Sequence, residues 1–206
     1  IFRKGKERLT KTDRIDAQLI ARELKDGRLT SIRVPDKCRE QLRSLFRRRN
    51  DLVKDMRQIK SYIKMQLLYY GMEIPPEHDN DHWSHDFRHW LDDLKFEYDT
   101  GTEVLRSRMR SFRFIDQEFR DVSTLLRKHT KTHFKQDYML LRSIPGIGPI
   151  VASGILGELG DLRRFKNIKH LAGYVGLAPG IYQSGDTLRH TGVSMRAHRL
   201  IRSYFI

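Results

Sequence analysis

The sequence predicts a mainly helical protein in which a long helical hairpin is followed by a small helical domain. Apolar residues recur at helical spacing over long segments, and between residues 36 and 70 this spacing becomes a sustained heptad pattern. Glycine becomes frequent after residue 136, which is typical of short helices joined by turns. We therefore expect three parts: the truncated end of an α/β domain at 1–35, a coiled-coil or helical-hairpin region at 36–136, and a C-terminal domain at 137–206.

The charge of the chain favours a polyanionic partner. Its 40 Lys and Arg residues exceed its 26 Asp and Glu residues, for a formal net charge of +14 and an isoelectric point near 10.1. DNA or RNA is the commonest partner of so basic a protein. A protein that is basic for solubility, or associated with ribosomes, remains an alternative on charge alone.

The sequence also restricts the cellular setting. No apolar run approaches the roughly 20 residues of a membrane-spanning helix, and no secretory signal is visible. The single cysteine, Cys38, excludes an intramolecular disulfide. We expect a cytoplasmic protein without membrane contact. Because the chain opens at Ile1 without a methionine and closes at Ile206 within an expected helical run, we also expect it to be part of a longer protein.

The first expected helix covers residues 12–26. Thr12 is placed as its N-cap and Gly27 as the residue that ends it, and a short extended stretch at 29–34 follows before Pro35. Asp13 and Asp16, three residues apart, project from one face of this helix. Two close carboxylates suit a hard divalent cation such as Mg²⁺, or Mn²⁺, of the kind that nucleases use to hold a phosphate. An acidic first turn that complements the helix dipole is the alternative.

The long helix expected at 36–70 has an apolar seam and strongly basic outer faces. The apolar seam consists of Leu42, Leu45, Leu52, Met56, Ile59, Ile63 and Tyr70. The basic residues are Arg39, Arg43, Arg47, Arg48, Lys54, Arg57, Lys60 and Lys64. A run of one sign favours contact with phosphate, notably through Arg43 and Arg47, although a solvated surface explains it equally well. We expect a second helix at 101–129 to pack back against the first.

The segment between these helices, residues 71–89, is expected to be a connector. It contains two prolines and a cluster of possible metal ligands, namely His78, Asp81, His82, His85 and His89. The cluster has no fixed ligand spacing, so it is only a weak indication of a metal site.

A glycine-rich turn between two apolar segments, at 141–159, predicts a helix-hairpin-helix. Gly146 and Gly148 occupy the turn, and small residues open the second helix. Glycines let such a turn approach a phosphate, which backbone N–H groups at the start of the second helix can then bind. Such hairpins grip the sugar-phosphate backbone without reading bases. A tight turn without a ligand is the alternative.

A second glycine-rich stretch, 171–202, is expected to form an irregular loop that carries a serine. Ser184 precedes Gly185, and the basic residues around it are Arg189, His190, Arg196, Arg199 and Arg202. A serine among arginines can attack a phosphodiester, because the cations stabilise the charge that develops on the phosphate. A plain Ser-Gly turn is the alternative.

The segments KTDRIDA, SIPGIGPIVASGILGELGDLRRFKNIKHLAGYVGLAP and YQSGDTLRHTGVS, in this order, resemble the insertion-sequence transposases of the "IS one-ten" group, which include the pilin-gene invertases. The resemblance implies the end of a RuvC-like domain with a DEDD set of acids, a coiled coil, and a C-terminal transposase domain. Asp13 and Asp16 match the last two acids, while the first two are expected before Ile1. Ser184 matches the nucleophilic serine, because Gln183 occupies the alternative position; Ser194 is held in reserve. Residues 71–100 match nothing in the family.

By this resemblance, the protein is expected to be a DNA recombinase that cuts and rejoins strands through a phosphoserine. Metal-binding acids and the serine are expected to work at a composite site shared between subunits. A structured guide RNA, a homo-oligomer formed through the coiled coil, and a prokaryotic, nucleoid-associated location are implied as well. Two alternatives stay open: a non-catalytic helix-hairpin-helix DNA-binding protein, and a RuvC-type metal nuclease without serine chemistry.

Overall fold

A computed structural model describes residues 12–29, 34–78, 83–184, 187–193 and 198–205. It divides into two compact units, residues 1–35 and residues 36–206. In the first unit, helix α1 spans Asp13–Lys25 and begins as predicted, with the Thr12 hydroxyl accepting the Ile15 N–H at 3.3 Å. The extended stretch expected at 29–34 lies mostly outside the described residues, and the α/β character of this unit stays a prediction.

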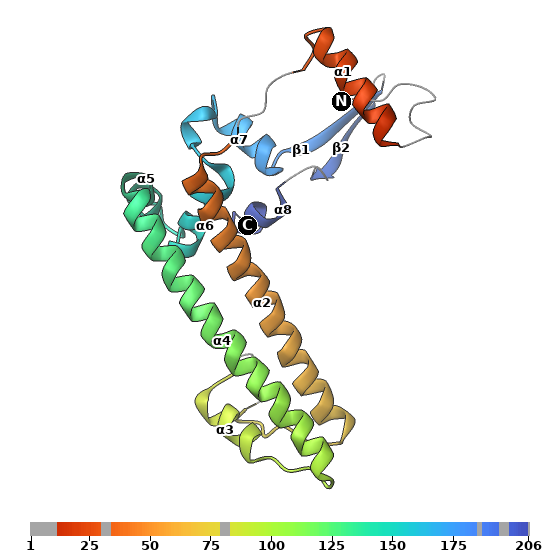
Figure 1. The fold of residues 1–206 in the computed structure, drawn as a ribbon, viewed down its shortest axis with the longest axis vertical. Coiled ribbons are helices and arrows are strands. Elements are labelled where there is room, and N and C mark those ends of the chain that lie inside the picture. The colour runs from red at the N-terminus through yellow and green to blue at the C-terminus, as the bar shows by residue number, and fades with distance from the viewer. Residues whose placement is uncertain (1–11, 30–33, 79–82, 185–186, 194–197, 206) are drawn as a thin grey trace. The chain divides into compact units, whose positions relative to one another are not determined.

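The second unit is built on two long helices that lie side by side (Figure 1). Helix α2 spans Lys37–Tyr69, with Asp36 as its N-cap, and α4 spans Asp99–His133. Their antiparallel order follows from side-chain contacts at both ends. Gln66 donates to the Gly101 carbonyl at 3.0 Å, while Arg49 donates to the Ser123 hydroxyl at 3.2 Å. The predicted helical hairpin is therefore confirmed within one chain, whereas pairing with a second chain stays a prediction.

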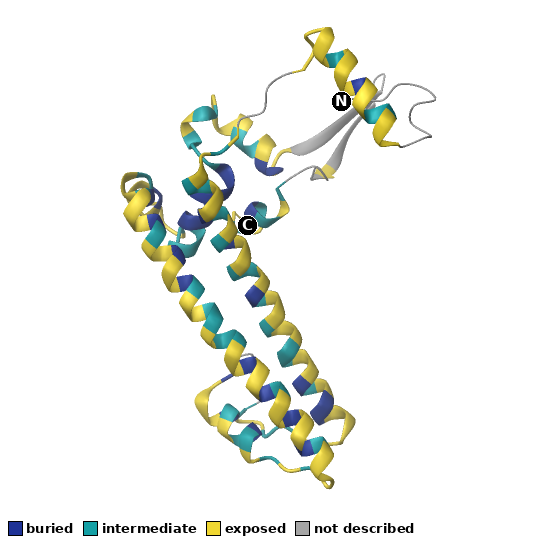
Figure 2. Ribbon diagram, viewed as in Figure 1, coloured by how far each residue is buried: buried dark blue, intermediate teal, exposed yellow. Residues whose placement is uncertain are grey.

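A short helix completes a separate core at the tip of this hairpin. Helix α3 spans His85–Asp93 and is capped by the Ser84 hydroxyl. This tip core consists of Ile63 and Leu67 of α2, Trp83, Phe87 and Leu91 of the connecting segment, and Leu105, Met109 and Phe112 of α4. Figure 2 shows the resulting alternation of buried and exposed residues along both long helices. The segment expected to be a connector therefore buries aromatic side chains against the helices it joins.

The other end of the hairpin encloses helix α6, Pro149–Leu159, which is preceded by α5, Lys135–Arg142. Every residue of α6 from Ala152 to Leu159 is buried, which accounts for its apolar composition on all sides. It approaches α2 closely because two glycines face that helix. A Cβ on Gly154 would overlap the Phe46 ring, and one on Gly157 would lie 3.2 Å from the Arg43 backbone nitrogen.

The remaining elements follow α6 in the sequence. They are a 3-10 turn η2 at Leu162–Arg164, α7 at Ile168–Val175, strands β1 at Pro179–Ser184 and β2 at Thr187–Val193, and α8 at Arg199–Arg202. Gly176, with φ of +83°, ends α7 in the left-handed region. The two strands pair antiparallel from Pro179↔Val193 to Ser184↔Thr187. The stretch expected to be an irregular loop is therefore a β-hairpin over this part, because the alternating residues of both segments satisfy each other's backbone hydrogen bonds.

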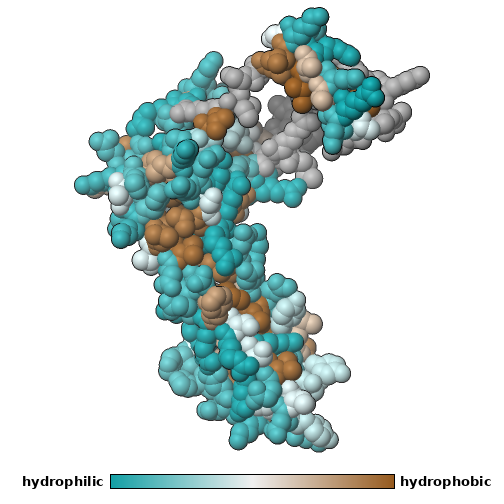
Figure 3. Space-filling view, viewed as in Figure 1, coloured by the Kyte–Doolittle hydropathy of each residue, from teal (hydrophilic) through white to brown (hydrophobic). Residues whose placement is uncertain are grey.

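The described residues confirm a mainly helical fold with one pair of strands. In Figure 3, hydrophilic surface predominates over the long helices, with apolar patches along them. Within the described part of the chain, no helix combines the length and apolar character that a membrane crossing requires.

Candidate functional site

The two aspartates expected to bind metal lie in the first turn of α1. Asp13 is exposed and Asp16 is partly buried, and the Asp16 backbone N–H donates to the Thr12 carbonyl at 3.1 Å. Because Thr12 caps the helix with its own hydroxyl, neither carboxylate is needed to accept the Ile15 N–H. Their spacing brings both side chains to one face of the helix. Two hard oxygen donors at this position fit part of a Mg²⁺ site.

The predicted helix-hairpin-helix has the expected local geometry. The turn between α5 and α6 is closed by the Ile147 N–H donating to the Ile144 carbonyl at 3.1 Å. Gly146 has φ of +86°, a conformation that glycine adopts without strain. Gly148 is the N-cap of α6 and supplies no side chain to the helix end, so the first N–H groups of α6 receive no side-chain cap. This end therefore suits an anion.

Basic side chains flank this turn. Arg142 is exposed and donates to the Ile147 carbonyl at 2.8 Å, which holds its guanidinium beside the turn. A hollow over the turn is lined by residues 142–148. A cation fixed beside uncapped backbone N–H groups strengthens the attraction for a phosphate group.

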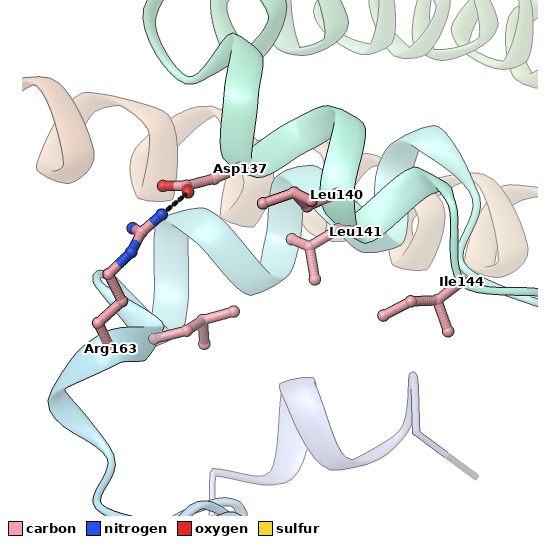
Figure 4. Close-up of a pocket in the computed structure, with 6 residues that line it drawn as sticks. Asp137, Leu140, Leu141, Ile144 and Arg163 are labelled. Atoms are coloured by element: carbon pink, nitrogen blue, oxygen red, sulfur yellow. Dashed lines mark hydrogen bonds and ion pairs between the residues drawn. The ribbon is translucent and has the colours of Figure 1, made fainter.

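A second hollow, next to α5, has a different character. Figure 4 shows Asp137 and Arg163 facing each other on one side of it, with Leu140, Leu141 and Ile144 along the other. The Arg163 guanidinium donates to Asp137 at 2.8 Å. Because this ion pair balances its own charge and the other walls are apolar, the hollow offers a phosphate little net attraction.

A cationic pocket between α2 and α4 was missed by sequence reasoning. Its lining residues are Arg49, Phe119, Arg120, Ser123, Thr124, Arg127 and Ile150. Ile150 belongs to the first turn of α6, so the pocket borders the uncapped helix end described above. No acidic side chain is among these lining residues.

The arginines of this pocket are held in place by neighbouring groups. Arg127 donates to the Ser123 carbonyl and the Thr124 hydroxyl, both at 3.1 Å, and Arg49 lies over the Phe119 ring at 4.7 Å. Burial lowers the pKa of Arg49, Tyr204 acts in the opposite direction, and Arg127 lowers it further. Two arginines that repel each other in a partly buried pocket favour an anion between them. Sequence alone gave no signal, since the pocket combines residues from three helices.

The proposed nucleophile lies on the β-hairpin. Ser184 is the last residue of β1 and pairs with Thr187 of β2. For residues 179–184, 187–191 and 193 the structure describes the backbone alone, so nothing is said of the side chains of Ser184 and Arg189. Arg196 and Ser194 lie outside the described residues altogether. The roles predicted for these residues stay predictions.

Helix α8 carries two of the arginines expected to contact phosphate. Arg199 is exposed and Arg202 is partly buried. The helix is anchored by His198, whose Nδ1 accepts the Ile201 N–H at 3.4 Å. This arrangement leaves the imidazole proton on Nε2, which donates to the Glu158 carboxylate at 3.0 Å. Phosphate contact by Arg199 and Arg202 stays a prediction.

Glu158 is the centre of a buried ionic cluster that also holds Arg43 and Arg47. Arg47 binds both Glu158 carboxylate oxygens, at 2.7 and 2.9 Å, while Arg43 donates to the Gly157 carbonyl at 3.1 Å and lies 3.4 Å from the carboxylate. The Glu158 side chain is 0% exposed. Burial alone would raise the pKa of Glu158, but hydrogen bonds from His198 and Arg47 outweigh it and lower the pKa to about 2.

This cluster gives Arg43 and Arg47 a structural role that the sequence did not indicate. Both were expected to contact phosphate, and in the structure both neutralise a carboxylate of α6. Arg47 keeps 55% of its side chain exposed. Contact of either residue with nucleic acid therefore stays a prediction, next to an established role in joining α2 to α6.

The histidine-rich segment shows no converging metal ligands among its described members. His78 lies against the rings of Phe87 and Trp90, with centroids 5.7 and 6.2 Å away. His85 and His89 are neighbours on exposed positions of α3, with ring centroids 4.4 Å apart. Asp81 and His82 lie outside the described residues.

Comparison with known proteins places these features in a family. Residues 138–206 match the transposase IS116/IS110/IS902 family model, and residues 2–72 match the DEDD transposase model of IS110. The chain is 28% identical over 198 residues to the putative transposase y4qE of Sinorhizobium fredii, which covers 95% of this chain and 46% of that protein. It is 22% identical over 204 residues to the transposase for insertion sequence element IS1111A of Coxiella burnetii, covering 95% of this chain and 53% of that protein.

A third relative matches the C-terminal part. The pilin gene-inverting protein of Moraxella bovis is 38% identical over 65 residues, which are 31% of this chain and 20% of that protein. The chain spans about half the length of the first two relatives. The two matching family models both describe IS110-type transposases, and together they cover about two thirds of the 206 residues. The chain therefore belongs to the IS110/IS116/IS902 family of transposases.

Proposed function

We propose that the full protein is a DNA transposase that cuts and rejoins DNA through a covalent phosphoserine at Ser184, assisted by Mg²⁺ bound at Asp13 and Asp16. One observation carries this proposal. The family match at 2–72 includes both aspartates, and the family match at 138–206 includes the serine. The two kinds of chemistry that the sequence indicates therefore fall in the two matched transposase segments.

In the serine step one phosphodiester linkage is exchanged for another, so the number of phosphodiester bonds stays the same. The Ser184 hydroxyl gives up its proton as its Oγ attacks the scissile phosphorus and forms a new P–O bond. The bond from phosphorus to the deoxyribose oxygen breaks, and that oxygen takes up a proton. Attack by the hydroxyl of another strand on the phosphoserine reverses the exchange and releases the serine. Nearby arginines, with Arg189, Arg196, Arg199 and Arg202 as our assignment, stabilise the negative charge that develops on the phosphate.

The donor set on α1 fits a divalent cation. Asp13 and Asp16 supply hard carboxylate oxygens, and a cation between them relieves the repulsion of two like charges one turn apart. Bound Mg²⁺, or Mn²⁺, would withdraw charge from phosphate oxygens. The role of the two aspartates is to hold that ion, and the family resemblance implies two further acids in the same set.

For nucleic-acid binding we assign the turn at Gly146 and Gly148 and the cationic pocket that borders it. The uncapped N–H groups of α6 favour phosphate, and so do Arg49 and Arg127 of the pocket. Ile150, in the first turn of α6, also lines this pocket. Neither element reads bases, so target choice requires another source. We propose a structured guide RNA as that source, with the basic outer face of α2 as one contact and a homo-oligomer as the active assembly.

The experiment that tests the proposal uses the full-length protein with its element DNA, its RNA and Mg²⁺. After quenching in denaturant, labelled DNA attached to protein is separated on a denaturing gel. We expect an adduct that is absent in Ser184→Ala and weaker in Asp13→Ala, while DNA binding persists in both. The matched control, Ser203→Ala at an exposed serine near the end of the chain, retains the adduct.

Two other outcomes separate the alternatives. Cutting without an attached protein indicates a metal nuclease in which the acids carry all the chemistry. Binding without cutting, in the presence of DNA, RNA and metal, indicates a helix-hairpin-helix binding protein. Recombination that survives Ser184→Ala refutes the serine assignment.

A further inference from the structure

The single cysteine of the chain lies beside two histidines at the base of the helical hairpin. Cys38 is in the first turn of α2, and His129 and His133 are in the last two turns of α4. The Cys38 Sγ is 3.6 Å from the His129 Nε2, and one ligand atom from each of the three residues lies within 4.8 Å of the others. Among the described residues, no other group of three or more possible metal-binding side chains brings its ligand atoms this close together.

The distance between Cys38 and His129 matches one edge of a tetrahedral metal site. With Zn–S near 2.3 Å and Zn–N near 2.0–2.1 Å, a tetrahedral angle places the sulfur and nitrogen ligands about 3.6 Å apart. A sulfur-nitrogen hydrogen bond accounts for the Cys38–His129 pair, but it does not explain the approach of His133. The two histidines are four residues apart on α4, with ring centroids 4.5 Å apart. This is the helical spacing by which two imidazoles can reach one metal ion.

The C-terminal end of α4 supplies favourable electrostatics. Its partial negative charge stabilises a cation bound near His133. The neighbouring Arg39 is directed elsewhere, since Asp36 accepts from its Nε at 3.1 Å and its guanidinium lies over the Phe134 ring. This arginine therefore does not occupy the position between the three ligands.

We propose that Cys38, His129 and His133 bind a zinc ion, with a fourth position open to water. A thiolate and two imidazoles are the borderline-soft ligands that favour zinc over Mg²⁺, so this site is distinct in chemistry from the carboxylate pair on α1. Cys38 and His129 are partly buried and His133 is exposed, which leaves one side of the site open to solvent. The ion joins the start of α2 to the end of α4, two segments that are 91 residues apart in the sequence.

The proposal does not rest on recombination chemistry, and a spectroscopic titration tests it directly. The reduced, metal-free 206-residue chain is titrated with Co²⁺, which reports thiolate coordination through a charge-transfer absorption band. Because Cys38 is the single cysteine of the sequence, that band can arise from no other residue. We expect one equivalent of Co²⁺ to bind with this band, Zn²⁺ to displace it, and Zn²⁺ to raise the melting temperature.

Two sets of variants provide the controls. Cys38→Ser abolishes the band, and His129→Ala weakens metal binding by roughly 100-fold or more, since loss of a direct ligand exceeds the effect of losing an outer-shell partner. The double variant His85→Ala/His89→Ala removes an exposed histidine pair of the same helical spacing and leaves the titration unchanged. Circular dichroism of metal-free Cys38→Ser matching that of the original chain verifies its fold. Absence of the thiolate band in the original chain, or loss of metal binding in the His85/His89 variant with retention in Cys38→Ser, overturns the proposal.

Discussion

Removing the charge of Glu158 should destabilise the second unit strongly, because this carboxylate joins three helices. Glu158 on α6 is fully buried, receives hydrogen bonds from Arg47 on α2, and accepts from His198 at the start of α8. The pKa of Glu158 falls from an ordinary value of 4.5 to about 2. At 1.36 kcal/mol per pKa unit, this shift corresponds to about 3 kcal/mol of stability at neutral pH.

The predicted change for Glu158→Gln is therefore a loss of about 3 kcal/mol at pH 7, within the range for breaking a buried ion pair. For a chain of this size, that loss lowers the melting temperature by roughly 6–12 °C. Because the folded-state pKa is depressed, the stabilisation is present above about pH 4.5 and is lost as the pH falls towards 2. The difference between the two proteins should shrink accordingly in acid.

Urea denaturation followed by circular dichroism at pH 7 and pH 3 measures this difference. Glu103→Gln is the control, since Glu103 forms an exposed ion pair with Arg106 on α4, and we expect it to change stability by no more than about 0.5 kcal/mol. Equal destabilisation by both substitutions would refute the reasoning. So would a Glu158→Gln effect that stays constant from pH 7 to pH 3.

Three further predictions concern packing, the turn and the cationic pocket. Gly154→Ala should cost about 1–3 kcal/mol in urea denaturation, because its Cβ would overlap the buried Phe46 ring, whereas Gly173→Ala on α7 meets no atom within 4 Å and should be neutral or stabilising. Gly146→Ala should cost about 1–2 kcal/mol, because φ of +86° is strained for alanine, and should also weaken DNA binding measured by fluorescence anisotropy; unchanged stability would contradict this. Arg127→Ala should lower the slope of log affinity against log salt by about 1, and an unchanged slope would remove the pocket from the phosphate contacts.

Local patterns predicted the elements whose partners lie nearby or repeat regularly. The seam of α2 was evident because Leu42, Leu52 and Ile63 recur at heptad spacing, and all three are fully buried. The turn at Gly146 was evident because a short glycine-rich run separates two apolar segments. Both are properties of a continuous stretch of chain, so composition and spacing were sufficient.

Features that depend on distant partners were not predicted. The partner of Arg47 is 111 residues away, and nothing in the basic pattern of α2 distinguishes it from its solvated neighbours. The sequence around Glu158, the partner of Arg47, did carry a signal. Glu158 is an acid within an otherwise apolar helix, and such a residue requires a buried cation. Helix α3 was also not predicted, although its sequence carried a signal. Ser84 followed by Phe87 and Leu91 is the pattern of a capped amphipathic helix.

The most direct test of the serine recombination account is to locate the covalent bond between protein and DNA. The full-length protein is trapped during the reaction with its DNA, RNA and Mg²⁺, digested with nuclease and protease, and the remaining nucleotide is mapped by mass spectrometry. The account predicts a nucleotide linked through phosphate to Ser184, and no linked peptide from Ser184→Ala. A linkage at Ser194 or at any other residue, or active cutting without any linked peptide, would contradict it.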